Sequence, residues 1–157
     1  MKNFLTLIAL AITFNLAAQD STYSVNSYLK EGMKAPNTHH IGDAWLNFLT
    51  QADEDFTYNI TQAKFAANAT LDWHKHSTPQ VLIVTEGIGY YQEKGKEAIK
   101  IRKGDVVKCK KNVEHWHTSS KKSMVSYIAI YGSSPTIWTT KLTREYYNSV
   151  AKKLEDQ

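Results

Sequence analysis

Turn-forming residues recur along most of this chain at short intervals, and this spacing limits the fold more than any other feature of the sequence. From residue 58 onward they are spaced about 7 to 11 residues apart, which is typical of short strands joined by tight turns. The segments between them, such as 81–84, 98–101 and 125–128, are rich in β-branched and aromatic residues. The turn-forming positions are Asn68, 77–79, 86–87, 94–95, 103–105, 111–112, 119–122 and 132–135. The pattern predicts an all-β sandwich or barrel.

The tail is the one part of this region with a helical period. Tyr146, Tyr147, Val150 and Leu154 fall on one face, and Thr143 is a candidate N-cap. We therefore expect a short C-terminal helix over residues 143–157, packed on a barrel formed by residues 44–142. A polar segment without periodicity, residues 19–43, is expected to form an N-terminal arm. The chain has 157 residues, which fits one folded domain.

The first 18 residues have the pattern of a secretory signal peptide. Lys2 provides the positive charge, residues 4–14 are mostly apolar, and small residues at 16–18 precede Gln19. The apolar run is shorter than the roughly 20 residues that a transmembrane helix needs, so no membrane span is expected. The alternative is a buried N-terminal helix. The signal peptide predicts a periplasmic or secreted bacterial protein.

Charge and cysteine content exclude two further classes. The net charge of +4 comes from scattered lysines and short basic doublets rather than from a basic stripe, so no nucleic-acid partner is expected. Cys109 is the only cysteine, so the domain has no intramolecular disulfide. Its alternating surroundings favour a small buried hydrophobic residue over a nucleophile.

Four of the six histidines form two His-x-His pairs, His74 with His76 and His115 with His117. Residues i and i+2 of a strand point to the same face, so each pair projects two imidazoles to one side. If both strands line one interior, the rings converge as a transition-metal site requires, whereas the alternative is a polar stripe on a solvated face. Gln80 follows the first pair after a turn that folds it back toward the same point. The adjacent His39 and His40 point to opposite sides of an extended segment and are interpreted as loop residues.

These residues resemble the two signatures of the cupin superfamily. The first signature places a glycine, His-x-His, an acidic residue and a second glycine at spacings that are kept here by Asn68, His74, His76, Gln80 and Gly87. The second signature is matched by Gly104, Lys110, Asn112, His115 and Ser119. Residues 73–76, 80–87, 91–95 and 115–117 are similar to the small bacterial metal-dependent cupins named beside carboxymuconolactone decarboxylase, a group that includes hydroxynitrile lyases.

The resemblance implies a cupin fold, that is, a jelly-roll or double-stranded β-helix barrel, with one divalent metal ion inside. The implied ligands are His74, His76, Gln80 and His115, and the implied ion is manganese, iron, nickel or zinc. Gln80 stands where the signature has glutamate, so the protein ligands cancel none of the charge of the ion. Asn68 and Asn112 stand where the signature has glycine, and Asn tolerates the left-handed backbone conformation well.

The expected function is that of a metal-dependent enzyme on a small organic substrate, of a lyase, decarboxylase or dioxygenase kind. The alternatives are a binding module for metal or a small ligand and a structural barrel with a residual site. His117 is the candidate general acid or base, with an expected pKa near 6.5; the alternatives are a fifth ligand or a hydrogen-bond partner of a ligand. A homodimer or higher homo-oligomer is expected, as in many cupins. Trp116 is assigned to the core or to packing on the sheet. Trp45, Trp138 and Tyr127 either line the ligand cavity or fill the core, and each is assigned to the core. Glu86 and Glu114 are expected to be exposed.

Overall fold

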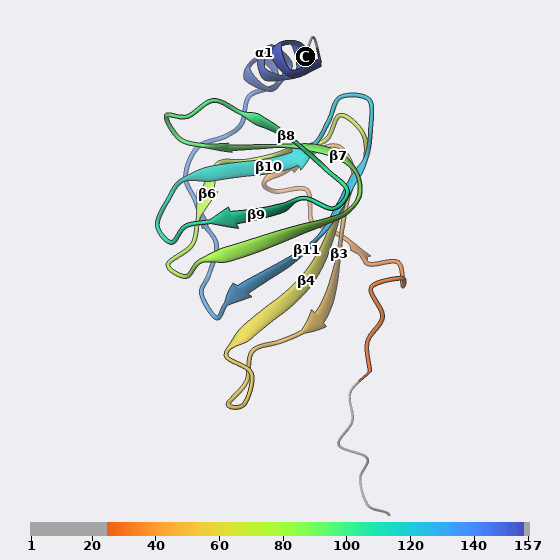
Figure 1. The fold of residues 1–157 in the computed structure, drawn as a ribbon, viewed down its shortest axis with the longest axis vertical. Coiled ribbons are helices and arrows are strands. Elements are labelled where there is room, and N and C mark those ends of the chain that lie inside the picture. Colours follow the sequence, from red (N-terminus) through yellow and green to blue (C-terminus); the bar gives the residue numbers. More distant parts are fainter. Residues whose placement is uncertain (1–24, 156–157) are drawn as a thin grey trace, which may run out of the picture.

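The computed structural model describes residues 25–155, which form a curled antiparallel sheet and one helix (Figure 1). The predicted signal peptide lies outside the described residues. The strands are β1 (Met33–Lys34), β2 (His40–Ile41), β3 (Ala44–Thr50), β4 (Tyr58–Phe65), β5 (Thr70–Leu71), β6 (His74–Lys75), β7 (Gln80–Glu93), β8 (Ile99–Arg102), β9 (Val106–Cys109), β10 (His115–Ser119), β11 (Val125–Gly132) and β12 (Ile137–Trp138), and the helix is α1 (Arg144–Glu155). The prediction of an all-β barrel with an N-terminal arm and a C-terminal helix is confirmed.

Strand β7 belongs to both halves of the curled sheet. Its first half pairs with β11 and β9, in a layer that continues through β4 and β3 to β1. Its second half pairs with β10 and β8, in a layer that continues through β6 to β12. The strand changes layer near Gly87, where φ is +74° and the register with β11 shifts nearby between Ser126 and Tyr127. A side chain at Gly87 would place its Cβ 1.9 Å from the Met124 carbonyl oxygen, so only glycine fits there.

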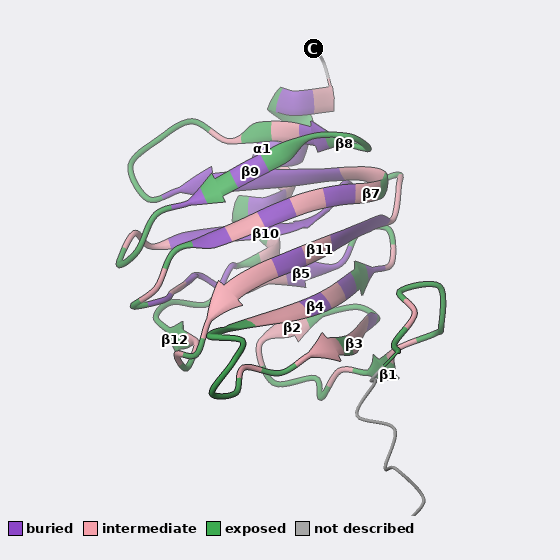
Figure 2. Ribbon diagram, turned by 60° about the horizontal axis from the view of Figure 1, so that its bottom comes forward, coloured by how far each residue is buried: buried purple, intermediate pink, exposed green. Residues whose placement is uncertain are grey.

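Alternation along the strands sorts side chains between an apolar interior and an outer surface. Leu82, Val84, Tyr127 and Ala129 are buried inside, whereas Ile83, Ile128 and Ile130 beside them are only half-buried. Figure 2 shows this alternation of buried and less buried positions along β7 and β11. A second apolar cluster lies outside the β7–β10 layer, where α1 covers it. It contains Trp73, Tyr90, Trp116, Leu142, Tyr147, Val150, Ala151 and Leu154.

The helix begins where the sequence predicts, because the Thr143 hydroxyl accepts a hydrogen bond from the Tyr146 backbone N–H at 3.1 Å. Its buried face was predicted only in part. Tyr147, Val150 and Leu154 are buried, but Tyr146 is 40% exposed and donates its hydroxyl to Gln92 Oε1. Ala151, which the sequence analysis did not include, belongs to the buried face. Within residues 25–155 no helix is long and apolar enough to cross a membrane.

The positions that replace motif glycines do have left-handed backbone conformations. Asn68 has φ of +64° and Asn112 has φ of +60°, and the retained Gly87 and Gly104 also have positive φ. Ser119, at the end of the second motif, donates its hydroxyl to the Ala66 carbonyl and accepts the Ala69 N–H, so it secures the turn around Asn68. The turns of both motifs therefore keep the geometry that glycine gives, although two of the glycines are absent.

These angles predict a sharp dependence on residue type at Asn112, which is exposed. The variant Asn112→Gly should keep the free energy of unfolding within about 0.5 kcal/mol of the original, whereas Asn112→Val should lower it by about 1–2 kcal/mol, because a β-branched residue is strained at positive φ. Urea unfolding measures both changes. Lys111→Val is the matched control, since Lys111 lacks the positive φ. An equal loss at both positions would show that backbone strain is not the cause.

Candidate metal centre

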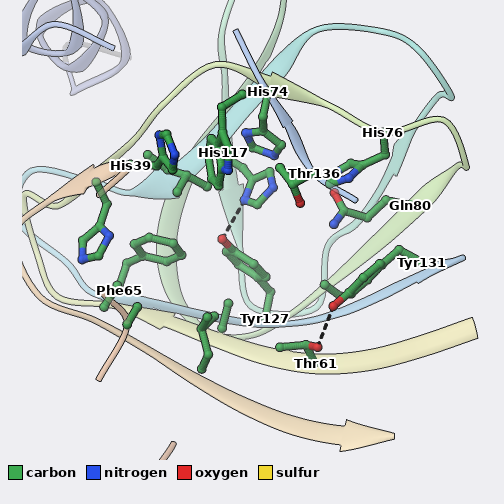
Figure 3. A pocket seen from close by; sticks show the side chains of 18 of the residues that line it. His39, Thr61, Phe65, His74, His76, Gln80, His117, Tyr127, Tyr131 and Thr136 are labelled. Atoms are coloured by element: carbon green, nitrogen blue, oxygen red, sulfur yellow. Dashed lines mark hydrogen bonds between the residues drawn. The ribbon is translucent and has the colours of Figure 1, made fainter. Parts of the chain in front are cut away.

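Three short segments bring the histidines and Gln80 to one place. His74 on β6 lies directly opposite His115 on β10 in the antiparallel register. His117 follows on the same face of β10, and His76 follows β6. Gln80 begins β7 and is buried. In Figure 3, the labelled side chains of His74, His76, Gln80 and His117 point into one cavity.

The imidazole rings are close enough to share one ion. The ring centroids of His74 and His115 are 4.5 Å apart, and those of His74 and His117 are 5.0 Å apart. The ligand atoms of His74, His115 and His117 lie within 4.8 Å of one another. His76 is slightly farther out, with ring centroids 5.3 Å from His74 and 5.7 Å from His115. The arrangement therefore brings together all four histidines of the two pairs, and it places His117 at least as near the centre as His76.

Backbone carbonyls fix the orientation of two of these rings. His74 Nδ1 lies 2.8 Å from the Asp72 carbonyl oxygen, and His115 Nδ1 lies 2.9 Å from the Val113 carbonyl oxygen. A carbonyl only accepts, so each Nδ1 carries the proton and donates it. The Nε2 lone pair of each ring is then free, which is the arrangement that metal-binding histidines usually have.

Buried nitrogen and oxygen atoms without a hydrogen-bond partner gather at this point. They are both ring nitrogens of His76, Oε1 of Gln80, and Nε2 of His115 and of His117. Each such atom costs about 1–3 kcal/mol when it is left unpaired in the interior. Imidazole nitrogens with an amide oxygen suit a divalent transition metal, so the donor set fits the ion that the sequence predicts.

Burial keeps these histidines neutral. Desolvation lowers the pKa of His74 to about 3 and that of His76 to about 4, and in both cases the neighbouring His115 contributes to the shift. It also lowers the pKa of His115, and it lowers the pKa of His117 well below its ordinary value. The expected pKa of His117 near 6.5 is therefore wrong, because the whole ring is desolvated. Neutral imidazoles are what metal binding requires, since the lone pair must be available.

His117 is held by a second buried group. Its Nδ1 lies 2.6 Å from the Tyr127 hydroxyl oxygen. Tyr127 is 1% exposed, and burial raises its pKa well above the ordinary value, so the phenol stays protonated. It packs in the core, as expected, but it also lines the cavity. This contact was not evident in the sequence, because Tyr127 lies ten residues from His117 on the next strand of the chain.

The cavity has a volume of about 370 Å³ and is mostly apolar apart from the histidines. Phe65, Leu71 and Ala129 form part of its wall, and none of the described residues that line it is Asp, Glu, Lys or Arg. The hydroxyls of Thr61 and Tyr131, which are 3.0 Å apart, are among the other polar groups. Glu86 is exposed, and Glu114 is part-buried in contacts with Lys94 and Thr139, so neither reaches the cavity.

The N-terminal arm closes one side of the cavity, which the sequence did not indicate. His39 and His40, which were interpreted as loop residues, both line the cavity. The His39 ring stacks on Trp138 at 4.1 Å, and His39 Nδ1 lies 3.4 Å from Asp72 Oδ2.

Trp138, assigned to the core, is 37% exposed and lines the cavity as the register partner of His74. Trp45, also assigned to the core, is half-buried on the outer side of β3, whereas Trp116 and Cys109 are buried as expected.

The neutral, buried histidines predict that the metal-free protein loses stability in mild acid. An unfolded histidine binds a proton with a pKa near 6.5, but His74 does so only near pH 3, so below pH 6.5 the unfolded state binds more protons. Between pH 7.5 and pH 5.5, His74 alone should lower the free energy of unfolding by about 1.4 kcal/mol. Urea unfolding of EDTA-treated protein at both values measures the loss. In His74→Asn, the loss in the free energy of unfolding between the two pH values should be smaller by about that amount. An unchanged loss would contradict the burial of His74.

Comparisons with known proteins agree with this geometry. A family profile described as "Cupin domain" matches residues 62–131, which include both His-x-His pairs. The (R)-mandelonitrile lyase of Granulicella tundricola is 29% identical over 117 residues, which cover 73% of this chain and 89% of that protein.

Solved structures show the same fold. The crystal structure of a cupin-like protein from Thermotoga maritima has a TM-score of 0.75 and 32% identity, over 81% of this chain and 98% of that chain. A predicted oxalate decarboxylase from the same organism has a TM-score of 0.61 and 17% identity, over 70% of this chain and 98% of that chain, and supports the fold alone. With the barrel, the histidine cluster and these relatives together, the chain belongs to the cupin family.

Proposed function

We propose that this protein is a metal-dependent lyase that cleaves a small organic substrate, of the α-hydroxynitrile class, inside the barrel. The observation that carries the proposal is the group of unpartnered, buried nitrogen and oxygen atoms of His76, Gln80, His115 and His117 around one point of the cavity. The similarity to an (R)-mandelonitrile lyase supports the choice of substrate class.

The proposed ligands are His74, His76, Gln80 and His115. All are neutral, so a bound divalent ion would retain its full charge and would supply Lewis-acid polarisation of a substrate oxygen. The carbonyls of Asp72 and Val113 hold two of the rings in the required tautomer. In the part of the chain that the structure describes, the wall around them carries no carboxylate that could compete as a ligand.

His117 is the proposed proton carrier. Cleavage of an α-hydroxynitrile to a carbonyl compound and hydrogen cyanide removes a proton from the hydroxyl group and returns one to the departing cyanide. The Nε2 atom of His117 has no partner and lies at the cavity, while Nδ1 is held by Tyr127. When Nδ1 carries the proton and donates it to the Tyr127 oxygen, the Nε2 lone pair is free to take up the proton of the substrate hydroxyl and then return it to the departing cyanide.

The shape of the cavity supports a small, partly apolar substrate. Its volume of about 370 Å³ falls at the lower end of the range for small-molecule sites. The aromatic surfaces of Phe65 and Trp138 and the aliphatic Leu71 provide contacts for a hydrocarbon substituent. Polar contacts come from Tyr131 and from Thr61, which lies on the same strand as Phe65.

Metal content and lyase activity together test the proposal. The purified protein should hold about one manganese, iron, nickel or zinc ion per chain by elemental analysis. His74→Ala and His115→Ala should each lower the occupancy sharply, because each removes one of the four proposed ligands. Ile99→Ala, at an exposed position of β8 that does not line the cavity, serves as the control with full occupancy. Full occupancy in both histidine variants would contradict the ligand set.

The loaded protein should release benzaldehyde from mandelonitrile, and treatment with EDTA should abolish the release. Restoration by one of the four metals would identify the active ion. If the protein holds the ion but cleaves no α-hydroxynitrile, the lyase assignment is wrong, and a binding module becomes the better description of the same site.

The role of His117 predicts a separation between binding and turnover. In His117→Ala, metal content should stay near that of the original protein, while turnover of mandelonitrile should fall at least about tenfold, because general acid–base help is lost. Tyr127→Phe keeps the aromatic ring and removes the hydrogen bond to His117, so it should lower turnover with metal content unchanged. Loss of metal in His117→Ala would show instead that His117 is a ligand.

A further inference from the structure

Two hydroxyl groups pair with each other in an otherwise apolar part of the cavity wall. Tyr131 on β11 and Thr61 on β4 both line the cavity, and their hydroxyl oxygens are 3.0 Å apart (Figure 3). The inward residues next to them, Ala63 on β4 and Ala129 on β11, are buried and apolar. Among the described residues, neither hydroxyl has a second hydrogen-bond partner. The pair is therefore an isolated polar point on the wall.

The sheet does not need this contact to hold its strands together. β11 pairs with β4 along its whole length, from Val125 to Gly132, through the backbone. Replacing both partners of a buried hydrogen bond by apolar groups of the same shape is often nearly neutral for stability. The two hydroxyls are therefore better explained by what the cavity holds than by the stability of the sheet.

The pair lies next to two of the proposed metal ligands. Tyr131 is the register partner of Gln80, and its ring centroid is 6.2 Å from that of His76. The other inward tyrosine of β11, Tyr127, is already bonded to His117. Figure 3 shows both hydrogen bonds at the same cavity. A molecule bound at the histidines can thus reach the hydroxyls of Thr61 and Tyr131 without leaving the cavity.

The chemistry of the pair selects a neutral hydroxyl group as its ligand. One hydrogen bond between two hydroxyls leaves one hydrogen to donate and several lone pairs to accept. A nitrile or a carbonyl group would use only the free hydrogen, whereas a ligand hydroxyl can both accept and donate. A carboxylate or an ammonium group would need an opposite charge, and none of the described lining residues is Asp, Glu, Lys or Arg.

We propose that the substrate carries a second hydroxyl group, on the substituent rather than at the reacting carbon, and that Thr61 and Tyr131 bind it. The inference rests on the proposed function and narrows its substrate class to α-hydroxynitriles with a hydroxylated substituent, such as a phenol. A site built around a hydroxyl rejects the analogue that lacks one, because the hydroxyls of the protein then stay unpaired.

Binding of aldehydes tests this inference without any need for cleavage. Benzaldehyde, meta-hydroxybenzaldehyde and para-hydroxybenzaldehyde are titrated calorimetrically into the purified protein, in mildly acidic buffer that keeps the phenols neutral. At least one of the two phenols should bind about tenfold more tightly than benzaldehyde, as one additional hydrogen bond to otherwise unpaired groups provides. Equal affinities for all three compounds would overturn the inference.

A double variant assigns the preference to the hydroxyl pair. Thr61→Val with Tyr131→Phe keeps the shape of the wall and removes both hydroxyls, so the preference for the phenol should disappear while benzaldehyde still binds. Tyr131→Phe alone, which changes the wall less, should reduce the preference. Tyr58→Phe is the matched control, because Tyr58 is an exposed residue of β4 that does not line the cavity, and the preference should remain. A preference that survives in the double variant would place the phenol elsewhere, for instance on the ion, and would overturn the inference.

The outcomes for the lyase and for the hydroxyl pair can be told apart. If mandelonitrile is cleaved but neither phenol is preferred, the proposed function stands and the inference fails. If a phenol is preferred through Thr61 and Tyr131 but no α-hydroxynitrile is cleaved, the lyase assignment fails and the hydroxyl site stands. If both hold, para- or meta-hydroxymandelonitrile should be cleaved with a kcat/KM about tenfold above that of mandelonitrile, mainly through a lower KM.

Discussion

Both the fold and the site depend on strand β7, which passes from one layer of the sheet to the other. Its first residue, Gln80, faces the cavity, and its last residues pair with the strand that carries His115 and His117. The change of layer needs a tight bend, which Gly87 permits because the Met124 carbonyl leaves no room for a side chain. A single continuous strand of 14 residues thus fixes where the histidines of β10 lie relative to Gln80.

The cluster is a strained feature of the metal-free chain. Four imidazoles lie within a few ångströms of one another, and several of their nitrogens have no hydrogen-bond partner. Burial lowers the pKa values of the rings, so they stay neutral and buried polar atoms remain unpaired. Each of these costs is offset when the lone pairs meet a cation. The same features that lower the stability of the empty site therefore provide affinity for an ion, and the surrounding sheet must supply the stability that holds the rings together beforehand.

Local pattern was sufficient for much of this structure. Alternation and turn residues predicted the strands, and the spacing of two motifs predicted which histidines and which glutamine meet. Asn68 and Asn112 behaved as glycine substitutes because their backbone preference is a property of the residue itself. The errors concern contacts between distant segments. His39 reaches the cavity because the arm pairs with β3 and β5. The pKa of His117 is lowered because the folded chain buries the ring. Residues that are adjacent in the sequence indicate neither effect.

The two faces of β11 differ, and only the inner face reaches the site. Tyr127 and Tyr131 point inward, to His117 and to the cavity wall, while Ile128 and Ile130 between and beside them point outward. A side chain cannot move far on one face of a strand without moving the backbone that carries its neighbours on the other. Contacts on the outer face of β11 therefore bear on the position of Tyr127, and through it on that of His117. The branched residues outside and the aromatic residues inside then serve one purpose, which is to hold a wall of the cavity in place.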